Sequence, residues 1–294
     1  MIVALSALWG LSPSFGKAIG GLGVGPFALV FWQSGLAAVI LLVVCVVRGV
    51  SLRIGAQHLK FFAVIGICCV GLAYANLIFV TQQISAGFMA IVIVLSPLLT
   101  YVIALAIRIE RFVAVRAVGV VVGLVGAALL VLPEGSLPSA DLIPLALLSF
   151  LTPLGFAVAN IYAETGRPEK TDNLVLAMGT SVGAALVGLV GALLFGNFFP
   201  LWQNPGEAAW LTVAFAVSSA AATMLFFAIV VRAGPVFLGQ VGYLVALVGI
   251  VYGMWFFGET YSGWLWFAGA LSFAGVAMVN MGKPGAVRPA PEDD

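Results

Sequence analysis

Uncharged polar and aromatic side chains interrupt several long apolar runs of this sequence. Tyr74 and Asn76 lie in one such run, and Gln240 and Tyr243 lie in another, far along the chain. Hydrocarbon offers these groups no hydrogen-bond partner, so they tend to face a protein interior or a cavity. There they could bind an uncharged or zwitterionic molecule, or they could bond to a neighbouring helix. Both interpretations stay open for these four residues.

The composition indicates that the surroundings of these residues are a lipid bilayer. Hydrophobic residues make up 63% of the chain and charged residues 8%, and the mean hydropathy is +1.20. Such a chain cannot cover a water-facing surface, so we expect an all-α integral membrane protein. The net charge of +1, without a basic tract, excludes nucleic-acid binding. Cys45, Cys68 and Cys69 lie in apolar runs without metal-ligand spacing, so no metal or cofactor site is expected.

The lengths of the apolar runs predict ten spanning helices. A span needs about 20 apolar residues, because each residue advances ~1.5 Å across a hydrocarbon core of ~30 Å. Runs without charge cover residues 2–16, 26–47, 61–107, 117–133, 142–163, 173–206, 208–231, 233–258 and 260–282. The run 61–107 is too long for one crossing, and Gln82, Gln83, Ser85 and Gly87 predict a break near its middle.

The basic residues predict the orientation of these helices. With ten spans, eleven of the twelve Lys and Arg fall on one face of the membrane, and only Lys17 falls on the other. The positive-inside rule places the basic face, and with it both termini, in the cytoplasm. The first run opens directly at Met1 with no cation before it, so no cleaved signal peptide is expected. The possibility that the first helix is incomplete at its N-terminus stays open.

Two distant segments, 85–110 and 234–259, have the same pattern: a small-residue opening, a long apolar run and a terminal Glu. Glu110 and Glu259 are 149 positions apart. Five helices per half is an odd number, so the second half must insert inverted. We predict repeats at 1–133 and 134–283, followed by a disordered tail at 284–294. Inverted repeats can open a shared midplane site to either side in turn, which favours a carrier.

Prolines in the two halves point to the position of such a site. Pro13 follows Trp9 and Ser12 in the first run, and Pro153 lies in the corresponding run of the second half. Proline leaves the carbonyl four residues earlier without its helical partner, which gives a cavity wall a polar group. The alternative is a packing kink, which we favour for Pro97 because its counterpart is Ala246. Trp9 lies near the middle of its run and could stack on a substrate, although tryptophan is also an interfacial anchor.

The predicted substrate-binding set is therefore Trp9, Ser12, Pro13, Tyr74, Asn76, Pro153, Gln240 and Tyr243. No Asp, Glu, Lys or Arg occupies the centre of a predicted span, which favours a neutral or zwitterionic substrate. Glu110 and Glu259 end corresponding runs at opposite faces and are candidate gates. Helix capping, or pairing with Arg111 or Arg116, is the alternative for Glu110.

A series of motifs resembles the EamA-type repeat of the drug/metabolite transporter superfamily. The series is Ala7-Leu8-Trp9-Gly10, Ser85-Ala86-Gly87, Pro97, Glu110, and Gly119, Gly123 and Gly126. Among its members the chain is similar to the YddG-type amino-acid exporters. The resemblance implies export of amino acids, including aromatic or other neutral ones, and of related small metabolites across a bacterial inner membrane. These relatives often have Arg after an aromatic residue early in the second helix, where this chain has Gln33.

Three other functions were weighed. A membrane enzyme would need an acid/base pair or a metal cluster, and the sole histidine, His58, has neither beside it, so no enzyme is expected. An ion pore would need rings of charge or of exposed carbonyls. A multidrug exporter of lipophilic compounds stays open, since 34 aromatic residues would suit it. The expected partners are the lipid bilayer and a small-molecule substrate. A monomeric state is one of the possibilities for the oligomeric state.

Overall fold

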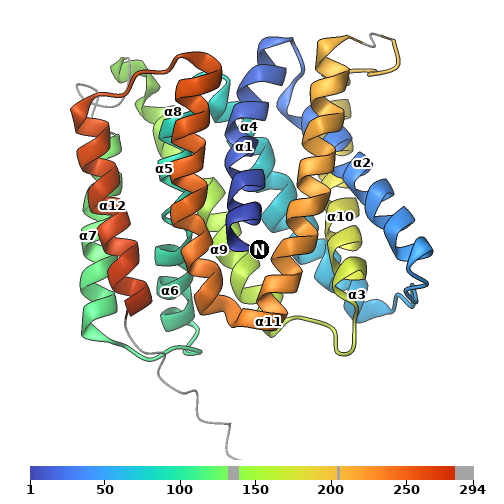
Figure 1. Cartoon of the computed structure of the whole chain (residues 1–294), viewed down its shortest axis with the longest axis horizontal. Helices are drawn as coiled ribbons and strands as arrows, with labels where there is room; N and C mark the ends of the chain where they lie inside the picture. The colour runs from blue at the N-terminus through green and yellow to red at the C-terminus, as the bar shows by residue number, and fades with distance from the viewer. Residues whose placement is uncertain (132–138, 204–205, 282–294) are drawn as a thin grey trace, which may run out of the picture.

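The computed structural model describes residues 1–131, 139–203 and 206–281, without the side chains of Ile2, Tyr243 and 230–240. The described residues form helices and no strand (Figure 1). The helices of the first half are α1 (Ile2–Gly21), α2 (Pro26–Val47), α3 (Ala56–Phe61), the π-helix η1 (Phe62–Gly71), α4 (Leu72–Thr81), α5 (Ala86–Ile93), α6 (Ser96–Ala106) and α7 (Ala114–Leu130). Those of the second half are the 3₁₀ helix η2 (Ala140–Leu142), α8 (Ile143–Ser149), α9 (Leu151–Thr165), α10 (Asn173–Leu194), α11 (Glu207–Phe257) and α12 (Gly263–Met281).

Seven of these helical segments are long and apolar enough to cross a membrane. They cover Pro26–Val47, Ala56–Thr81, Ala86–Ala106, Ala140–Thr165, Asn173–Leu194, Glu207–Ile229 and Gly263–Met281. Two shorter apolar segments cover Ala114–Leu130 and Leu244–Phe257. The expected ten spans would require these two and α1 as well, so the count of ten stays a prediction. The break expected within 61–107 lies where it was predicted, between Thr81 and Ala86.

The helices stand side by side, and the linkers gather at two opposite ends of the bundle (Figure 1). We call the lower end in that view the Glu110 end: it holds the linkers after α2, α6 and α9. The upper end, called the Glu259 end, holds the linkers after α1, α4 and α11. Basic residues are concentrated in the linkers of the Glu110 end, including Arg48, Arg53, Arg108, Arg111 and Arg167. Lys17 lies at the other end, so the described basic residues agree with the predicted segregation of charge, while the orientation in the membrane stays a prediction.

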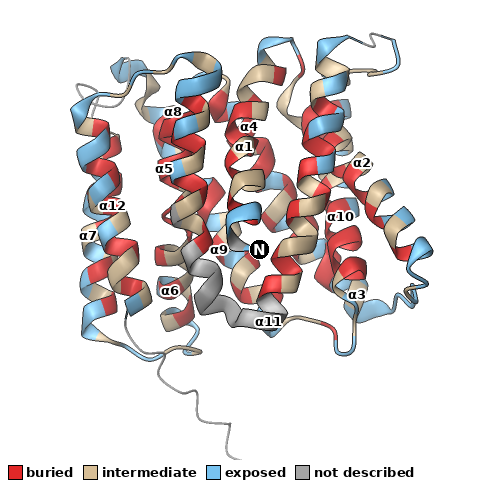
Figure 2. Cartoon of the chain, viewed as in Figure 1, coloured by how far each residue is buried: buried red, intermediate tan, exposed pale blue. Residues whose placement is uncertain are grey.

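Exposed positions lie along the outside of the bundle (Figure 2), and many of them are large apolar residues. On α2 the exposed positions include Val43, Val46 and Val47, at 55%, 66% and 80% exposure, whereas Leu41 on the opposite face is fully buried. Exposing such side chains to water would cost free energy in proportion to their area, whereas lipid solvates them. The distribution of apolar residues thus matches a bundle surrounded by hydrocarbon.

Close contact between backbones holds pairs of helices together. The main pairs are α1 with α11, α2 with α10, and α7 with α12. At the contact of η1 with α10, a Cβ added to Gly183 would lie 2.6 Å from the Phe62 carbonyl oxygen. At the contact of α7 with α12, a Cβ added to Gly119 would lie 2.6 Å from the Gly275 carbonyl oxygen. These separations are below van der Waals contact, so only glycine fits, as is common where membrane helices pack through small residues.

We expect Gly183→Ala to destabilise the protein by about 1–3 kcal/mol, because the added methyl group overpacks the seam between α10 and η1. Thermal unfolding in detergent measures the change. Gly21→Ala is the matched control, since a Cβ at Gly21 meets no atom within 4 Å. Equal stability of the two variants would contradict the close packing described here.

Candidate functional site

Two helices of the bundle are broken near prolines. The first break separates α5, which ends at Ile93, from α6, which begins at Ser96. Pro97 follows it and has no N–H to donate to the Ile93 carbonyl. The second break lies at Phe150, between α8 and α9, three residues before Pro153. Each break releases backbone groups from the helical ladder, and in hydrocarbon those groups need other partners.

Asn76 on α4 supplies such a partner at the second break. Its Nδ2 donates to the Leu148 carbonyl oxygen at 3.0 Å and to Thr152 Oγ1 at 2.9 Å. Thr152 Oγ1 in turn donates to the Ala73 carbonyl oxygen at 3.1 Å. These hydrogen bonds join α4 to α8 and α9 across the break. Asn76 therefore binds a neighbouring helix, the second of the two interpretations that the sequence left open.

A cavity of about 280 Å³ lies between the two halves of the chain. Its wall takes residues from both halves, including Trp9 and Ser12 of α1, Tyr74 of α4, Phe156 of α9 and Phe226 of α11. The first break also contributes: Ile93, Ser96, Pro97 and Thr100 all line the cavity. Aromatic rings and hydroxyl groups thus face one internal space, an arrangement typical of small-molecule sites.

Gln33 on α2 is the most unusual polar residue of this wall. Its side chain is 1% exposed, and its Nε2 donates to Ser34 Oγ at 2.6 Å. Its Oε1 is buried and accepts no hydrogen bond from the described residues. Leaving a buried acceptor unpaired costs about 1–3 kcal/mol, so such groups are rare in folded proteins. The amide is therefore a candidate for contact with a bound molecule.

The charged side chains of the wall lie together at the Glu110 end. Glu110 follows α6, Arg116 lies in the first turn of α7, and Glu164 lies in the last turn of α9. Arg116 Nη1 donates to Glu110 Oε2 at 3.2 Å, and the guanidinium lies 5.3 Å from the centre of the Tyr101 ring. Glu110 thus makes the ion pair with Arg116 that was the alternative to gating.

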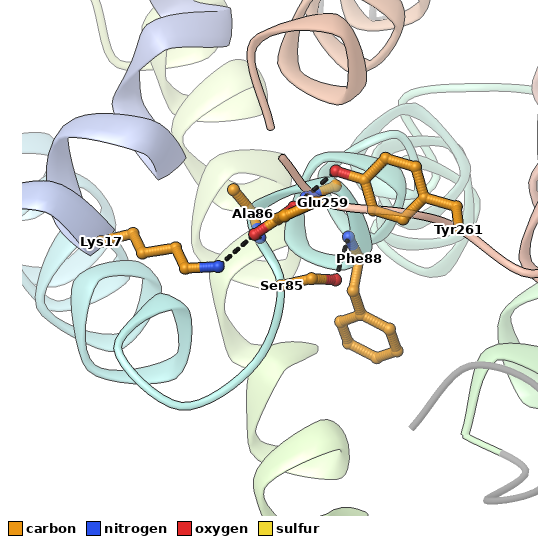
Figure 3. A network of polar contacts seen from close by, with 7 residues as sticks. Lys17, Ser85, Ala86, Phe88, Glu259 and Tyr261 are labelled. Carbon is orange, nitrogen blue, oxygen red and sulfur yellow. Dashed lines mark hydrogen bonds and ion pairs between the residues drawn. The ribbon is translucent and has the colours of Figure 1, made fainter. Parts of the chain in front are cut away.

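Glu259 organises the opposite end (Figure 3). Its carboxylate pairs with the Lys17 ammonium and accepts a hydrogen bond from the Tyr261 hydroxyl. The same carboxylate accepts the backbone N–H groups of Ala86 at 3.0 Å and Gly87 at 3.3 Å, while Ser85 Oγ accepts that of Phe88 at 3.2 Å. An anion at a helix N-terminus is stabilised by the free N–H groups and the helix dipole. This carboxylate therefore fastens α1 and the linker after α11 to the start of α5.

The network changes the protonation equilibria of the linker 258–262. Burial alone would raise the pKa of Glu259, but hydrogen bonds from Lys17, Tyr261 and Ala86 outweigh it and hold the pKa below its ordinary value of 4.5. Burial and the adjacent Glu259 carboxylate raise the pKa of Tyr261. At neutral pH the carboxylate is therefore charged and the phenol is protonated, which is the pairing that the geometry requires.

The structure brings part of the predicted substrate set together. Trp9, Ser12 and Tyr74 lie in the cavity wall, together with Glu110. Pro13 and Pro153 are buried outside this wall, and Asn76 bonds between helices. The side chains of Gln240 and Tyr243 lie outside the described residues. A substrate contact stays a prediction for each of these residues.

Two residues of the wall were missed by the sequence argument. Pro97 was interpreted as a packing kink because its counterpart is Ala246, yet it lies beside the first helix break and lines the cavity. Gln33 was noted only as a departure from a familial arginine. Its position within an otherwise apolar run, next to Ser34, was the signal that could have identified it.

Part of the sequence is similar to a known family of membrane proteins. A model of the EamA-like transporter family matches residues 1–132. The first half of the chain is therefore similar to the EamA-like transporter family. The members of this family are transporters and not enzymes, so the match and the apolar helices support a multi-pass membrane transporter of the drug/metabolite transporter superfamily.

Fifteen chains of solved structures resemble this EamA-like chain. One of them, described only as "Crystal structure of protein", aligns over 94% of this chain and 95% of its own, with a TM-score of 0.66 and 18% identity. At that identity the likeness shows the fold alone. No curated protein matches the sequence.

We expect Asn76→Leu to lower the stability of this EamA-like protein by about 1–2 kcal/mol, because the Leu148 carbonyl and Thr152 would lose their partner. Thermal unfolding in detergent measures the effect. Thr165→Val is the control, since that hydroxyl bonds only within its own helix, to the Ile161 carbonyl. A loss no larger than that of the control would show that the second break does not depend on Asn76.

Glu259→Gln should lower stability by about 1–3 kcal/mol at neutral pH, because a charged hydrogen-bonding group is removed. The folded pKa of Glu259 is depressed, so its contribution is complete above 4.5 and is lost as the pH falls through the lower, folded value. Unfolding curves of wild type and variant should therefore converge as the pH is lowered from 7 to 3. Glu169→Gln, at an exposed linker position, should match wild type throughout. A constant difference across the pH range would contradict this assignment.

Proposed function

We propose that the protein exports amino acids, including aromatic or other neutral ones, and related small metabolites across a bacterial inner membrane by alternating access. Ten spans form two inverted five-helix repeats, 1–133 and 134–283, with both termini in the cytoplasm. The observation that carries the proposal is the cavity between the two halves, whose charged groups lie at one end while its centre has aromatic rings and hydroxyl groups. Such a lining suits a neutral or zwitterionic solute.

The residues at the two ends of the bundle support a conformation in which the cavity is open to one side of the membrane only. The cavity wall includes Glu110, Arg116 and Glu164 at the Glu110 end of the bundle, which is the end rich in basic residues. At the other end, the Glu259 network joins α1, α5 and the linker before α12, and none of its residues lines the cavity. With the basic end in the cytoplasm, this is the loading state of an exporter. Glu259 then acts as the external gate, and Glu110 as its counterpart on the cytoplasmic side.

The pairing of helices supports the inverted repeat. Under the 149-residue offset, α2 corresponds to α10 and α7 to α12, and these helices pack on each other. The contact of α1 with α11 has a matching set in the other half. There α9, the counterpart of α1, packs on η1, α4 and α6. A pseudo-twofold axis in the membrane plane would produce this pattern, because it maps each contact onto another contact. Two related halves could then exchange conformations around the cavity.

The test is counterflow in proteoliposomes of the purified protein. Loaded with an unlabelled neutral amino acid, they should accumulate the labelled compound transiently and saturably. Asn160→Leu should reduce the rate, because Asn160 lines the cavity and its Nδ2 lies 3.5 Å from Ser96 Oγ. Cys68→Ser, on an exposed position of η1, is the control and should transport like wild type.

A multidrug exporter for lipophilic compounds is the second candidate, favoured by the aromatic rings of the cavity wall. The same proteoliposomes distinguish the two. Movement of a lipophilic cation without movement of any amino acid would replace the first proposal by the second. Linear, non-saturable uptake would exclude both carriers and indicate a pore.

A further inference from the structure

We infer that the cavity recognises the ammonium group of its substrate, that Gln33 is the residue that selects for this group, and that a carboxylate on the substrate is dispensable. The inference rests on the proposed function and narrows its substrate class to small primary amines, of which amino acids are one kind. Three features of the cavity wall support it: the direction in which its threonine hydroxyl groups donate, the unpaired oxygen of Gln33, and the excess of acidic over basic side chains.

Three threonine hydroxyl groups of the wall donate their hydrogens to backbone carbonyls of their own helices. Thr100 Oγ1 donates to the Ser96 carbonyl at 2.8 Å, Thr180 Oγ1 to the Leu176 carbonyl at 2.9 Å, and Thr223 Oγ1 to the Ser219 carbonyl at 2.8 Å. A hydroxyl has one hydrogen and two lone pairs. Each of these groups, which come from three different helices, therefore offers the cavity an acceptor. A ligand that donates hydrogen bonds fits them, and one that only accepts does not.

Gln33 adds a stronger acceptor on the α2 side. Its amide nitrogen donates to Ser34 Oγ, and its Oε1 has no hydrogen-bond partner among the described residues although the side chain is almost fully buried. An ammonium group has three N–H donors and no acceptor. Its entry beside Gln33 would satisfy this oxygen, whereas a carboxylate there would face an oxygen atom and be repelled.

The charges and rings of the wall favour the same ligand. Among the described residues that line the cavity, two are acidic, Glu110 and Glu164, and one is basic, Arg116. The Arg116 guanidinium is 4% exposed and is paired with Glu110, so it is not free to hold a carboxylate. The faces of aromatic rings carry negative potential, and Trp9, Tyr74, Phe156 and Phe226 supply four of them. Among the described residues of the wall, these charges and rings favour a cationic group over an anionic one.

The test is calorimetric binding to the purified protein in detergent, with probes that differ in one group each. L-Phenylalanine has both charged groups, 2-phenylethylamine lacks the carboxylate, and 3-phenylpropanoate lacks the ammonium. We expect 2-phenylethylamine to bind within about threefold of phenylalanine, and 3-phenylpropanoate to bind at least about tenfold more weakly, because it leaves the acceptors unpaired. Equal binding of 3-phenylpropanoate and 2-phenylethylamine would overturn the inference while leaving amino-acid transport standing.

The role of Gln33 is tested separately. Gln33→Met removes the acceptor at similar size, and we expect it to reduce the preference for 2-phenylethylamine over 3-phenylpropanoate to about twofold or less. Gln33→Glu keeps an acceptor at the same place and should preserve or increase the preference. The matched control is Gln83→Met at an exposed position, with the wild-type preference expected.

Each remaining outcome has a defined meaning. An unchanged preference in Gln33→Met would overturn the assignment of selectivity to this residue. If Gln33→Met does not fold, Gln33→Glu and the wild-type probe series still decide the matter. Absence of counterflow with every neutral amino acid, together with binding of 2-phenylethylamine, would remove the amino-acid proposal and keep the amine selectivity.

Discussion

Hydrocarbon supplies no hydrogen bonds, and this constraint determines where each polar group of the chain can lie. Backbone groups are satisfied within helices, and charged side chains lie at the ends of the bundle. Where a helix breaks inside the membrane, another residue must complete the bonding. Asn76 does this for the Leu148 carbonyl beside the break at Phe150. Other uncharged polar groups, among them Ser12, Gln33 and Thr100, line the cavity, so the same constraint that shapes the bundle also concentrates its binding chemistry.

The two glutamates at the ends of the segments 85–110 and 234–259 make different contacts in the structure. Glu259 accepts N–H groups at the start of α5 and pairs with Lys17, whereas Glu110 lies in the cavity wall and pairs with Arg116. Two related halves in the same conformation would use both carboxylates alike. Under the proposed alternating access, such a difference is expected of two related halves when the carrier is open to one side only.

The sequence predicted the class of the fold because that class depends on composition and on run length. Long apolar runs, the break near Ser85 and the concentration of cations at one end follow from hydrophobicity and charge alone. The cavity wall was harder to predict. Trp9, Ser12 and Tyr74 stood out as polar or aromatic residues in apolar runs, but so did Asn76, whose partner Leu148 is distant in the sequence.

Whether a polar side chain faces a neighbouring carbonyl or an open space depends on tertiary contacts that no local pattern contains. For the same reason the position of Pro97 in the cavity wall was not predicted. Its environment is set by α9 packing against α6 across the cavity, and the comparison with Ala246 in the other half contained no information about that contact.

The glycine seams have a consequence for the route by which a solute could reach the cavity. Where Gly119 approaches the backbone at Gly275, and Gly183 approaches Phe62, the helices touch through main-chain atoms. An acyl tail or a lipid-dissolved compound has no room to slip sideways between them. Along these two seams the interior is closed to the bilayer, so a solute that reaches the cavity must take another route.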